Sequence, residues 1–305
     1  MIINFEKEHG YDSDGNSQVT FKRVHSLGHD WVYVSGYRKG SIITDTTPVA
    51  PFSVVHDPEC PCHLEGISID IFGPGKTPSL KDNALLETFK DEYEATFPRD
   101  EAEPWDEIVD RCCGVNDIYP GVGTYMAVLK DRRIPVGALI VEHYKTSNVL
   151  LITYCFVKRA YRRAGKGYAR KLMLDGSSEI RRRAGVPRDE PRILFEGENP
   201  DLMPTADIAR APFDPYARLK WFDSLGARRL PIRYAQPPLS KDRGSVPWLN
   251  LYCLGEGALS LETLTAFLKE FYKVLEVNVA PEDLGNYHKT LDAQLREIAE
   301  SIDYA

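Results

Sequence analysis

The chain begins with strand-like runs of apolar residues. Val19 to Val24, Trp31 to Tyr37 and Gly66 to Phe72 are rich in β-branched and aromatic residues, and clusters of Gly, Pro, Asn and Asp separate them. No pattern in this stretch points to a chemistry. We therefore expect residues 1–79 to form a β-rich N-terminal extension.

Two helices and three strands are predicted next. Apolar residues from Ser79 to Phe97 recur close to the helical period, which is typical of an amphipathic helix, and a shorter helix is expected from Pro104 to Cys113. Tyr125–Leu129, Pro135–His143 and Val149–Val157 are apolar runs separated by short polar turns, as in an antiparallel meander. The last run is nearly all apolar, which predicts a central strand buried on both faces.

A glycine-containing loop and a long helix follow this central strand. After Arg162-Arg-Ala-Gly165-Lys-Gly167-Tyr168, apolar residues recur at helical spacing from Ala169 to Ala184. Arg192 to Asn199 is then predicted as a strand, Tyr216 to Ala227 as a helix and Pro247 to Leu254 as a last strand. We expect residues 80–257 to form one mixed α+β domain.

Two helical stripes end the chain. Leu261 to Leu275 follow Ser260, and Leu284 to Ile302 follow Pro281, with apolar residues on one side of each. Such stripes usually face a core. The final stripe is nearly heptad-like, so a homodimer contact is an alternative. Residues 258–305 are expected to be a C-terminal helical extension.

An ordinary globular composition excludes several classes of protein. The 305 residues are 43% hydrophobic and 27% charged, unlike fibrous or disordered chains. The first ten residues lack the basic-then-apolar order of a signal peptide, and the run Val149–Val157 is too short to span a bilayer. We expect a cytoplasmic protein without a membrane contact.

The charges are unevenly distributed. Residues 158–192 contain twelve Lys or Arg against four acids, a local excess of +8 in a chain whose net charge is −7. A basic island on an acidic protein suits a polyanion, either nucleic acid or a phosphorylated small molecule. The island lacks interleaved exposed aromatics and any known nucleic-acid module, which favours the small molecule.

Six cysteines are too few for a disulfide framework, so reduced thiols are expected. The cluster His56-x3-Cys60-x-Cys62-His63 contains residue types that zinc accepts, but its one-residue spacing between cysteines is not that of a zinc knuckle. We predict a turn with buried thiols and no metal.

The loop before the long helix has the features of an anion site. Glycines allow the backbone to approach a ligand, the N–H groups of the first helical turn have no intrahelical acceptor, and the helix dipole favours negative charge there. A pyrophosphate matches such donors. The residues concerned run from Arg162 to Tyr168.

Arg162-x-x-Gly165-x-Gly167 resembles the Gln/Arg-x-x-Gly-x-Gly/Ala signature of the GCN5-related N-acetyltransferase (GNAT) superfamily. The following strand, its terminal Asn199 and the helix Tyr216–Ala227 resemble the next family elements in order, over roughly residues 80–255. The resemblance implies an α/β/α sandwich with a mixed, mostly antiparallel sheet whose strands near residues 150 and 195 splay apart.

The resemblance also implies which residues bind the cofactor, acetyl-CoA or another acyl-CoA. In the family the loop grips the coenzyme A pyrophosphate and the preceding strand pairs with the pantetheine arm. Carried over to this sequence, the cofactor-binding set is Phe156, Val157, Arg162, Arg163, Ala164, Gly165, Lys166, Gly167, Tyr168 and Asn199.

The sequence departs from the family at both usual catalytic positions. Leu151 stands where many relatives carry a general-base glutamate, and Phe222 stands where a tyrosine often protonates the leaving thiolate. A proline- and aspartate-rich insertion from Pro200 to Pro215 is expected to wall the acceptor pocket.

The candidate catalytic residues are therefore Glu196, Glu198 and Glu142 as proton acceptors and Tyr154 as an acid, with Tyr216 and Tyr234 as alternative acids. Each is also compatible with an ordinary surface or packing role. The predicted function is acyl-CoA-dependent N-acyl transfer, most simply of acetyl, to an amine of a small molecule or peptide. The alternative is a non-catalytic acyl-CoA-binding or regulatory module of the same fold.

Overall fold

The computed structural model describes residues 5–11, 18–26, 29–38, 41–43, 66–74, 80–97, 102–115, 118–162, 166–211, 213–241 and 244–302. The chain divides into two compact units, Met1–Cys60 and Pro61–Ala305. Each unit is described by itself.

The first unit contains a four-stranded antiparallel sheet. Its strands are β1 (Phe5–Tyr11), β2 (Gln18–Ser26), β3 (His29–Arg38) and β4 (Ser41–Ile43), and they pair in chain order. The strand at residues 67–72 belongs instead to the sheet of the second unit, because it pairs along its whole length with residues 126–131. The division at Cys60 is therefore earlier than the boundary expected at residue 79.

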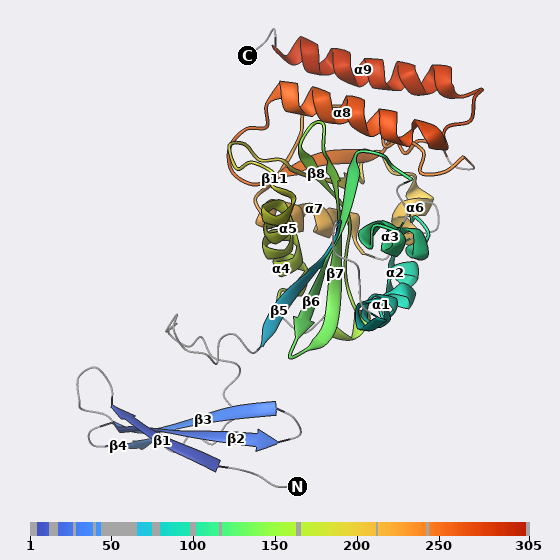
Figure 1. Ribbon diagram of the computed structural model, residues 1–305. Coiled ribbons are helices and arrows are strands. Elements are labelled where there is room, and N and C mark those ends of the chain that lie inside the picture. Colours follow the sequence, from blue (N-terminus) through green and yellow to red (C-terminus); the bar gives the residue numbers. More distant parts are fainter. Residues whose placement is uncertain are drawn as a thin grey trace. The chain divides into compact units, whose positions relative to one another are not determined.

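The second unit is a sheet covered by helices on both faces (Figure 1). In chain order its elements are β5 (Ile67–Phe72), α1 (Leu80–Glu87), α2 (Lys90–Thr96), α3 (Trp105–Cys112), β6 (Val122–Asp131), β7 (Ile134–Tyr144), β8 (Val149–Val157), α4 (Tyr168–Lys171), α5 (Ser177–Ala184), β9 (Ile193–Glu198), α6 (Thr205–Arg210), α7 (Pro215–Ser224), β10 (Ala227–Arg229), β11 (Leu249–Leu254), α8 (Leu261–Leu275) and α9 (Leu284–Ile302). A π-helical turn, Leu172–Gly176, joins α4 and α5 into one continuous helix.

The seven strands are ordered β10-β11-β9-β8-β7-β6-β5. Every neighbouring pair is antiparallel except β8 and β9, which are parallel. This confirms the predicted α+β class with a mixed, mostly antiparallel sheet. The parallel pair arises because the loop and helix of residues 158–192 connect β8 to β9 as a crossover.

Two helical layers bury the two faces of this sheet. The helix 168–184 and α7 pack on one face with a core that includes Leu139, Ile180 and Phe222, and we call this the α5 face. On the other face, which we call the α8 face, α1–α3 pack near β5–β8 and α8 packs near β8, β9 and β11. The α8 and α9 helices lie side by side in Figure 1.

The predicted helix from Ser79 to Phe97 is interrupted. α1 ends at Glu87 and α2 begins at Lys90, with tight turn bonds from the Thr88 N–H to Leu85 and from the Phe89 N–H to Leu86. Phe89 is fully buried and contacts Phe156 edge-on at 5.8 Å between ring centroids. The predicted single helix is therefore two helices.

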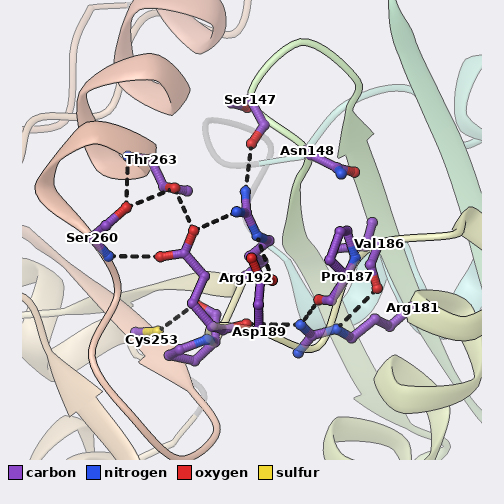
Figure 2. Close-up of polar contacts among 12 residues, drawn as sticks. Ser147, Asn148, Arg181, Val186, Pro187, Asp189, Arg192, Cys253, Ser260 and Thr263 are labelled. Carbon is purple, nitrogen blue, oxygen red and sulfur yellow. Dashed lines mark hydrogen bonds and ion pairs between the residues drawn. The ribbon is translucent and has the colours of Figure 1, made fainter.

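The start of α8 is fastened to the loop that precedes β9 (Figure 2). The Glu190 carboxylate accepts from the Ser260 N–H at 2.8 Å and from the Thr263 hydroxyl at 2.6 Å, and it pairs with Arg192 at 2.5 Å. Arg192 also donates to the Ser147 carbonyl at 3.1 Å. The predicted C-terminal helical segment is therefore bonded at its start to the rest of the second unit.

No helix in the described ranges is both long and apolar enough to cross a membrane.

Candidate functional site

β8 carries a β-bulge at the point where it leaves β9. The parallel pairing of the two strands covers only three residues of β8, Leu150 to Ile152. The register of β8 against β7 shifts directly afterwards, so that Thr153 is left over between two pairs. Because a bulge bends and twists its strand, the extra residue accounts for the divergence of β8 from β9.

The bulge also exchanges the faces to which β8 side chains point. Ile152 packs in the core of the α5 face, whereas Tyr154 and Phe156 pack against α1–α3 on the opposite face. In a regular strand these three side chains would share one face. Tyr154 and Phe156 thereby become part of a wall beside the opening between the strands.

A cavity of about 620 Å³ lies in this opening. Residues 152–157 of β8, 195–198 of β9 and 166–170 at the helix start line it. The remaining lining residues are Thr96, Phe97, Tyr161, Arg162, Met173, Phe213, Asp214, Ala217, Arg218, Trp221, Phe222, Gln236 and Leu249. This volume and the mostly apolar and aromatic lining are typical of a small-molecule site.

The cavity reaches both faces of the sheet. Its helix-start residues belong to the α5 face. On β9, Phe195 packs on that same face, and strand alternation directs Glu196 to the α8 face, on which Leu194 also packs. Two ligands could thus approach the opening from opposite faces.

The helix start has the local geometry that suits an anion. Gly167 has φ 65° and ψ 30°, and the first helical hydrogen bond runs from the Lys171 N–H to the Gly167 carbonyl at 2.9 Å. The N–H groups of Tyr168, Ala169 and Arg170 therefore have no intrahelical acceptor, and the helix behind them places positive dipole charge at this end. All three residues line the cavity.

The two cations expected to meet phosphate already have acidic partners. Arg162 pairs with Glu92 at 2.6 Å, and it donates to the Thr96 hydroxyl at 2.7 Å and the Val157 carbonyl at 2.8 Å. Lys166 pairs with Asp131 at 2.6 Å. These side chains hold the two ends of the loop in place, so the backbone N–H groups are the donors best placed for a phosphate.

Of the three candidate carboxylates, Glu196 and Glu198 line the cavity. Glu196 accepts from the Tyr234 hydroxyl and, at 2.7 Å, from the Gln236 amide. Glu198 forms an ion pair with Arg218. The Glu198 carboxylate is thus held by a guanidinium, whereas two neutral donors orient the Glu196 carboxylate.

Glu142 lies outside the cavity, in a buried cluster between α3 and β7. Its carboxylate accepts from the Tyr144 hydroxyl at 2.8 Å and lies 3.5 Å from Arg111, which also pairs with Glu103 at 2.9 Å. Burial raises the pKa of the Glu142 carboxyl to about 7; the Glu103 charge adds to the rise and Arg111 opposes it.

The raised pKa of Glu142 predicts a pH-dependent contribution to stability. The folded protein holds this proton more tightly than the unfolded chain, whose carboxyl titrates near 4.5, so the contribution is present below pH 4.5 and is lost as the pH rises through about 7. The free energy of unfolding of the wild type, minus that of Glu142→Gln, should therefore fall over this range. Urea denaturation at several pH values measures it, and a difference that rises with pH would contradict the assignment.

The two positions at which the family resemblance places catalytic side chains carry apolar residues, and the candidate acid Tyr154 is buried. Leu151 is buried in the core of the α8 face and does not line the cavity. Phe222 lines the cavity, and its ring lies 4.8 Å from that of Phe195. Tyr154 also lines the cavity, but its hydroxyl accepts from the Glu103 N–H at 3.1 Å, and burial raises the pKa of this tyrosine well above its ordinary value.

Residues from the insertion after β9 do contribute to the cavity wall. Phe213 and Asp214 line the cavity directly before α7. The Phe213 ring lies 5.1 Å from the Arg162 guanidinium and 5.7 Å from that of Arg218. Cation–π contacts of this kind hold the ring at the cavity although 43% of Phe213 remains exposed.

Four of the expected cofactor-binding residues are not among the described residues that line the cavity. Arg163, Ala164 and Gly165 lie outside the described residues, as do His56, Cys60, Cys62 and His63. Asn199 lies just beyond β9, where its side chain accepts from the Asp201 N–H at 3.2 Å, and it does not line the cavity. Within the described ranges, no three His, Cys, Asp or Glu residues gather as a metal site would require.

Gln236 and Arg218 are site residues that the sequence analysis missed. Arg218 sits on α7 four residues before Phe222, so it lies one helical turn away from a residue that the family resemblance already singled out. Gln236 lies two residues after Tyr234 in a segment without regular periodicity. No sequence signal would have identified it.

No family model matches this chain, and no curated protein matches it. Solved structures do. A protein from Bacteroides thetaiotaomicron, proposed to be an acetyltransferase of the GNAT family, is 16% identical over 70% of this chain and 99% of its own, with a TM-score of 0.46. The catalytic domain of Tetrahymena GCN5 histone acetyltransferase with coenzyme A is 14% identical over 64% of this chain and 96% of its own, with a TM-score of 0.36.

YncA from Salmonella typhimurium, proposed to be an acetyltransferase and solved with acetyl-CoA, is 16% identical over 64% of this chain and 97% of its own, with a TM-score of 0.36. GNAT-family acetyltransferases are thus among the structures that this chain resembles, and the loop motif resembles the same family. Identities of this size leave side chains free to differ, so the chemistry of the site has to come from this chain's own residues.

Proposed function

We propose that this protein is an acyl-CoA-dependent N-acyltransferase that binds its acyl donor in the cavity between β8 and β9. The observation that carries the proposal is the divergence of a parallel strand pair beside a helix start whose first three N–H groups have no intrahelical acceptor. A diphosphate would meet these N–H groups, and an extended arm would lie along β8. Acetyl is the simplest acyl group for the proposal.

The residues present fit such a donor. Gly167 lines the cavity, and among the described residues other than its chain neighbours no atom would lie within 4 Å of an added Cβ. Residues 153–157 of β8 extend beyond its pairing with β9 and present a backbone edge to the cavity. When bound, the donor supplies a thioester carbonyl activated for attack by an amine.

This chain's residues would position the acceptor and remove its proton. Glu196 reaches the cavity from the α8 face, opposite the helix start, and neutral donors on Tyr234 and Gln236 orient its carboxylate. We assign it the role of accepting the proton that leaves the amine nitrogen during attack. Phe97, Tyr154 and Phe213 supply apolar surface elsewhere in the cavity wall.

The first experiment is binding of acetyl-CoA and longer acyl-CoAs to the full chain by titration calorimetry, followed by release of free thiol with a broad panel of amines. We expect micromolar binding, which corresponds to about −8 kcal/mol, and thiol release with at least one amine. Absence of binding by every acyl-CoA would refute the proposal.

A non-catalytic acyl-CoA-binding module is the second candidate. Leu151 and Phe222 favour it, because both usual catalytic positions of the family resemblance carry apolar side chains that pack in cores. Tight acyl-CoA binding without thiol release across the amine panel would support this candidate over the enzyme.

A further inference from the structure

A second groove lies beside the C-terminal half of the helix that begins after Gly167. Its volume is about 550 Å³, and it is formed by α5, the start of β10 and the loop after β11. It lies at the sheet end where β9 begins and β11 ends, marked by Ile193 and Leu254. No lining residue is shared with the cavity of the candidate site.

The groove concentrates positive charge that the protein does not neutralise. Arg181, Arg188 and Arg228 line it together with a single acid, Glu256. Within the described residues, none of these arginines forms an ion pair, whereas Arg162 in the first cavity pairs with Glu92. Arg188 and Arg228 are exposed and accessible to a ligand.

The acids nearest to Arg188 in sequence are engaged elsewhere (Figure 2). Asp189 and Glu190 pair with Arg192 at 3.5 Å and 2.5 Å, and Glu190 also accepts from the start of α8. Both carboxylates of the loop between α5 and β9 therefore already have partners. The groove therefore keeps the charge of the flanking arginines, Arg181 and Arg188.

Arg181 is held in position by carbonyl groups, as Figure 2 shows. Its guanidinium donates to the carbonyls of Val186 at 3.4 Å, of Glu190 at 2.8 Å and of Pro187. Carbonyl oxygens fix the orientation of a guanidinium without cancelling its charge. Burial lowers the pKa of Arg181, and the Arg188 charge lowers it further, while the Asp189 charge opposes the change.

We propose that this groove binds a small phosphate-bearing anion, of the size of a diphosphate or nucleotide, through Arg181, Arg188 and Arg228. Guanidinium groups match phosphate oxygens with paired N–H donors, and Arg181 is already oriented. The groove has the volume of a small-molecule site. It also gives a role to the basic residues after 180 that the first cavity does not use. The proposal does not depend on the acyl-CoA function.

Inorganic pyrophosphate is the probe, titrated into the full chain by calorimetry at one ionic strength. Wild type should bind it, and the double variant Arg188→Ala/Arg228→Ala should bind at least tenfold more weakly. Because a diphosphate would also meet the helix start after Gly167, the same comparison is made in the Gly167→Val background, where the tenfold loss is decisive. Arg181 is left intact because its carbonyl bonds support the loop before β9. Gly167→Val, which disables the first cavity's helix start, should retain the groove's binding.

Arg229→Ala is the matched control. Arg229 is the next residue of β10, is equally exposed, and points to the opposite face of its strand, outside the groove. The proposal is overturned if wild type does not bind, if the double variant binds as tightly as wild type, or if Arg229→Ala weakens binding equally. A parallel titration with acetyl-CoA separates the sites, because an equal loss of acetyl-CoA affinity in the double variant would make the groove part of the donor site.

Discussion

Gly167→Val is expected to weaken acyl-CoA binding by at least roughly tenfold while the fold persists. Gly167 has φ 65°, a left-handed conformation that costs an L residue about 1–2 kcal/mol. The new side chain would project into the cavity, because no atom of the described residues beyond its chain neighbours lies within 4 Å of the added Cβ. Titration calorimetry with acetyl-CoA measures the loss.

Gly185→Val separates the ligand effect from backbone strain. Gly185 ends the same helix at φ 71°, its added Cβ would also have no atom within 4 Å, and it does not line the cavity. Both variants should lower the melting temperature similarly, because both force a branched side chain into the left-handed region. If Gly185→Val weakens acetyl-CoA binding as much as Gly167→Val does, the helix start is not the phosphate site.

The elements best predicted from sequence are those whose signal is local and strong. Val149–Val157 was expected as a buried central strand and is β8 with the same bounds, because a continuous apolar run of this length has few alternatives. The helix after Gly167 and α8 were predictable for a similar reason, because each has apolar residues at helical spacing that pack against the sheet. Helical spacing can be read from a short stretch of sequence without knowledge of distant partners.

The parts that escaped prediction depend on distant partners. Residues 67–72 look like any other early strand, and only their pairing with β6 places them in the second sheet. The bulge at Thr153 is a shift in the pairing of β8 with β7, so the sequence of β8 alone does not predict it. Arg162 looked available for phosphate because Glu92, its partner, precedes it by seventy residues in the chain.

Dependence on distant partners also explains why the sequence alone did not distinguish the candidate carboxylates. Glu142, Glu196 and Glu198 all lie on strands next to the expected opening, and strand alternation assigns each a face only when every bulge is known. The structure separates them by surroundings: a buried cluster for Glu142, neutral donors for Glu196 and a guanidinium for Glu198. This difference in partners carries the second large prediction.

Glu196→Gln is expected to lower kcat by roughly 10²-fold or more, the usual contribution of a positioned general base. Glutamine keeps the size of the side chain. Its single amide oxygen can still accept from Gln236 and its NH2 group can donate to the Tyr234 hydroxyl, but it cannot take a proton from the attacking amine. Acyl-CoA affinity should stay within about twofold, because Glu196 lies on the acceptor side of the cavity. Thiol release with an amine that the wild type uses measures kcat, and calorimetry measures affinity.

Glu198→Gln and Glu142→Gln are the matched controls for this prediction. Glu142→Gln lies outside the cavity and should leave kcat unchanged, which excludes a general effect of removing a buried acid. Glu198→Gln leaves the Arg218 guanidinium without its carboxylate and should act mainly on acceptor KM, because Glu198 would position charge beside the acceptor instead of accepting its proton. Should Glu198→Gln abolish kcat while Glu196→Gln retains it, the proton acceptor is Glu198, and the ion pair with Arg218 must open during the reaction.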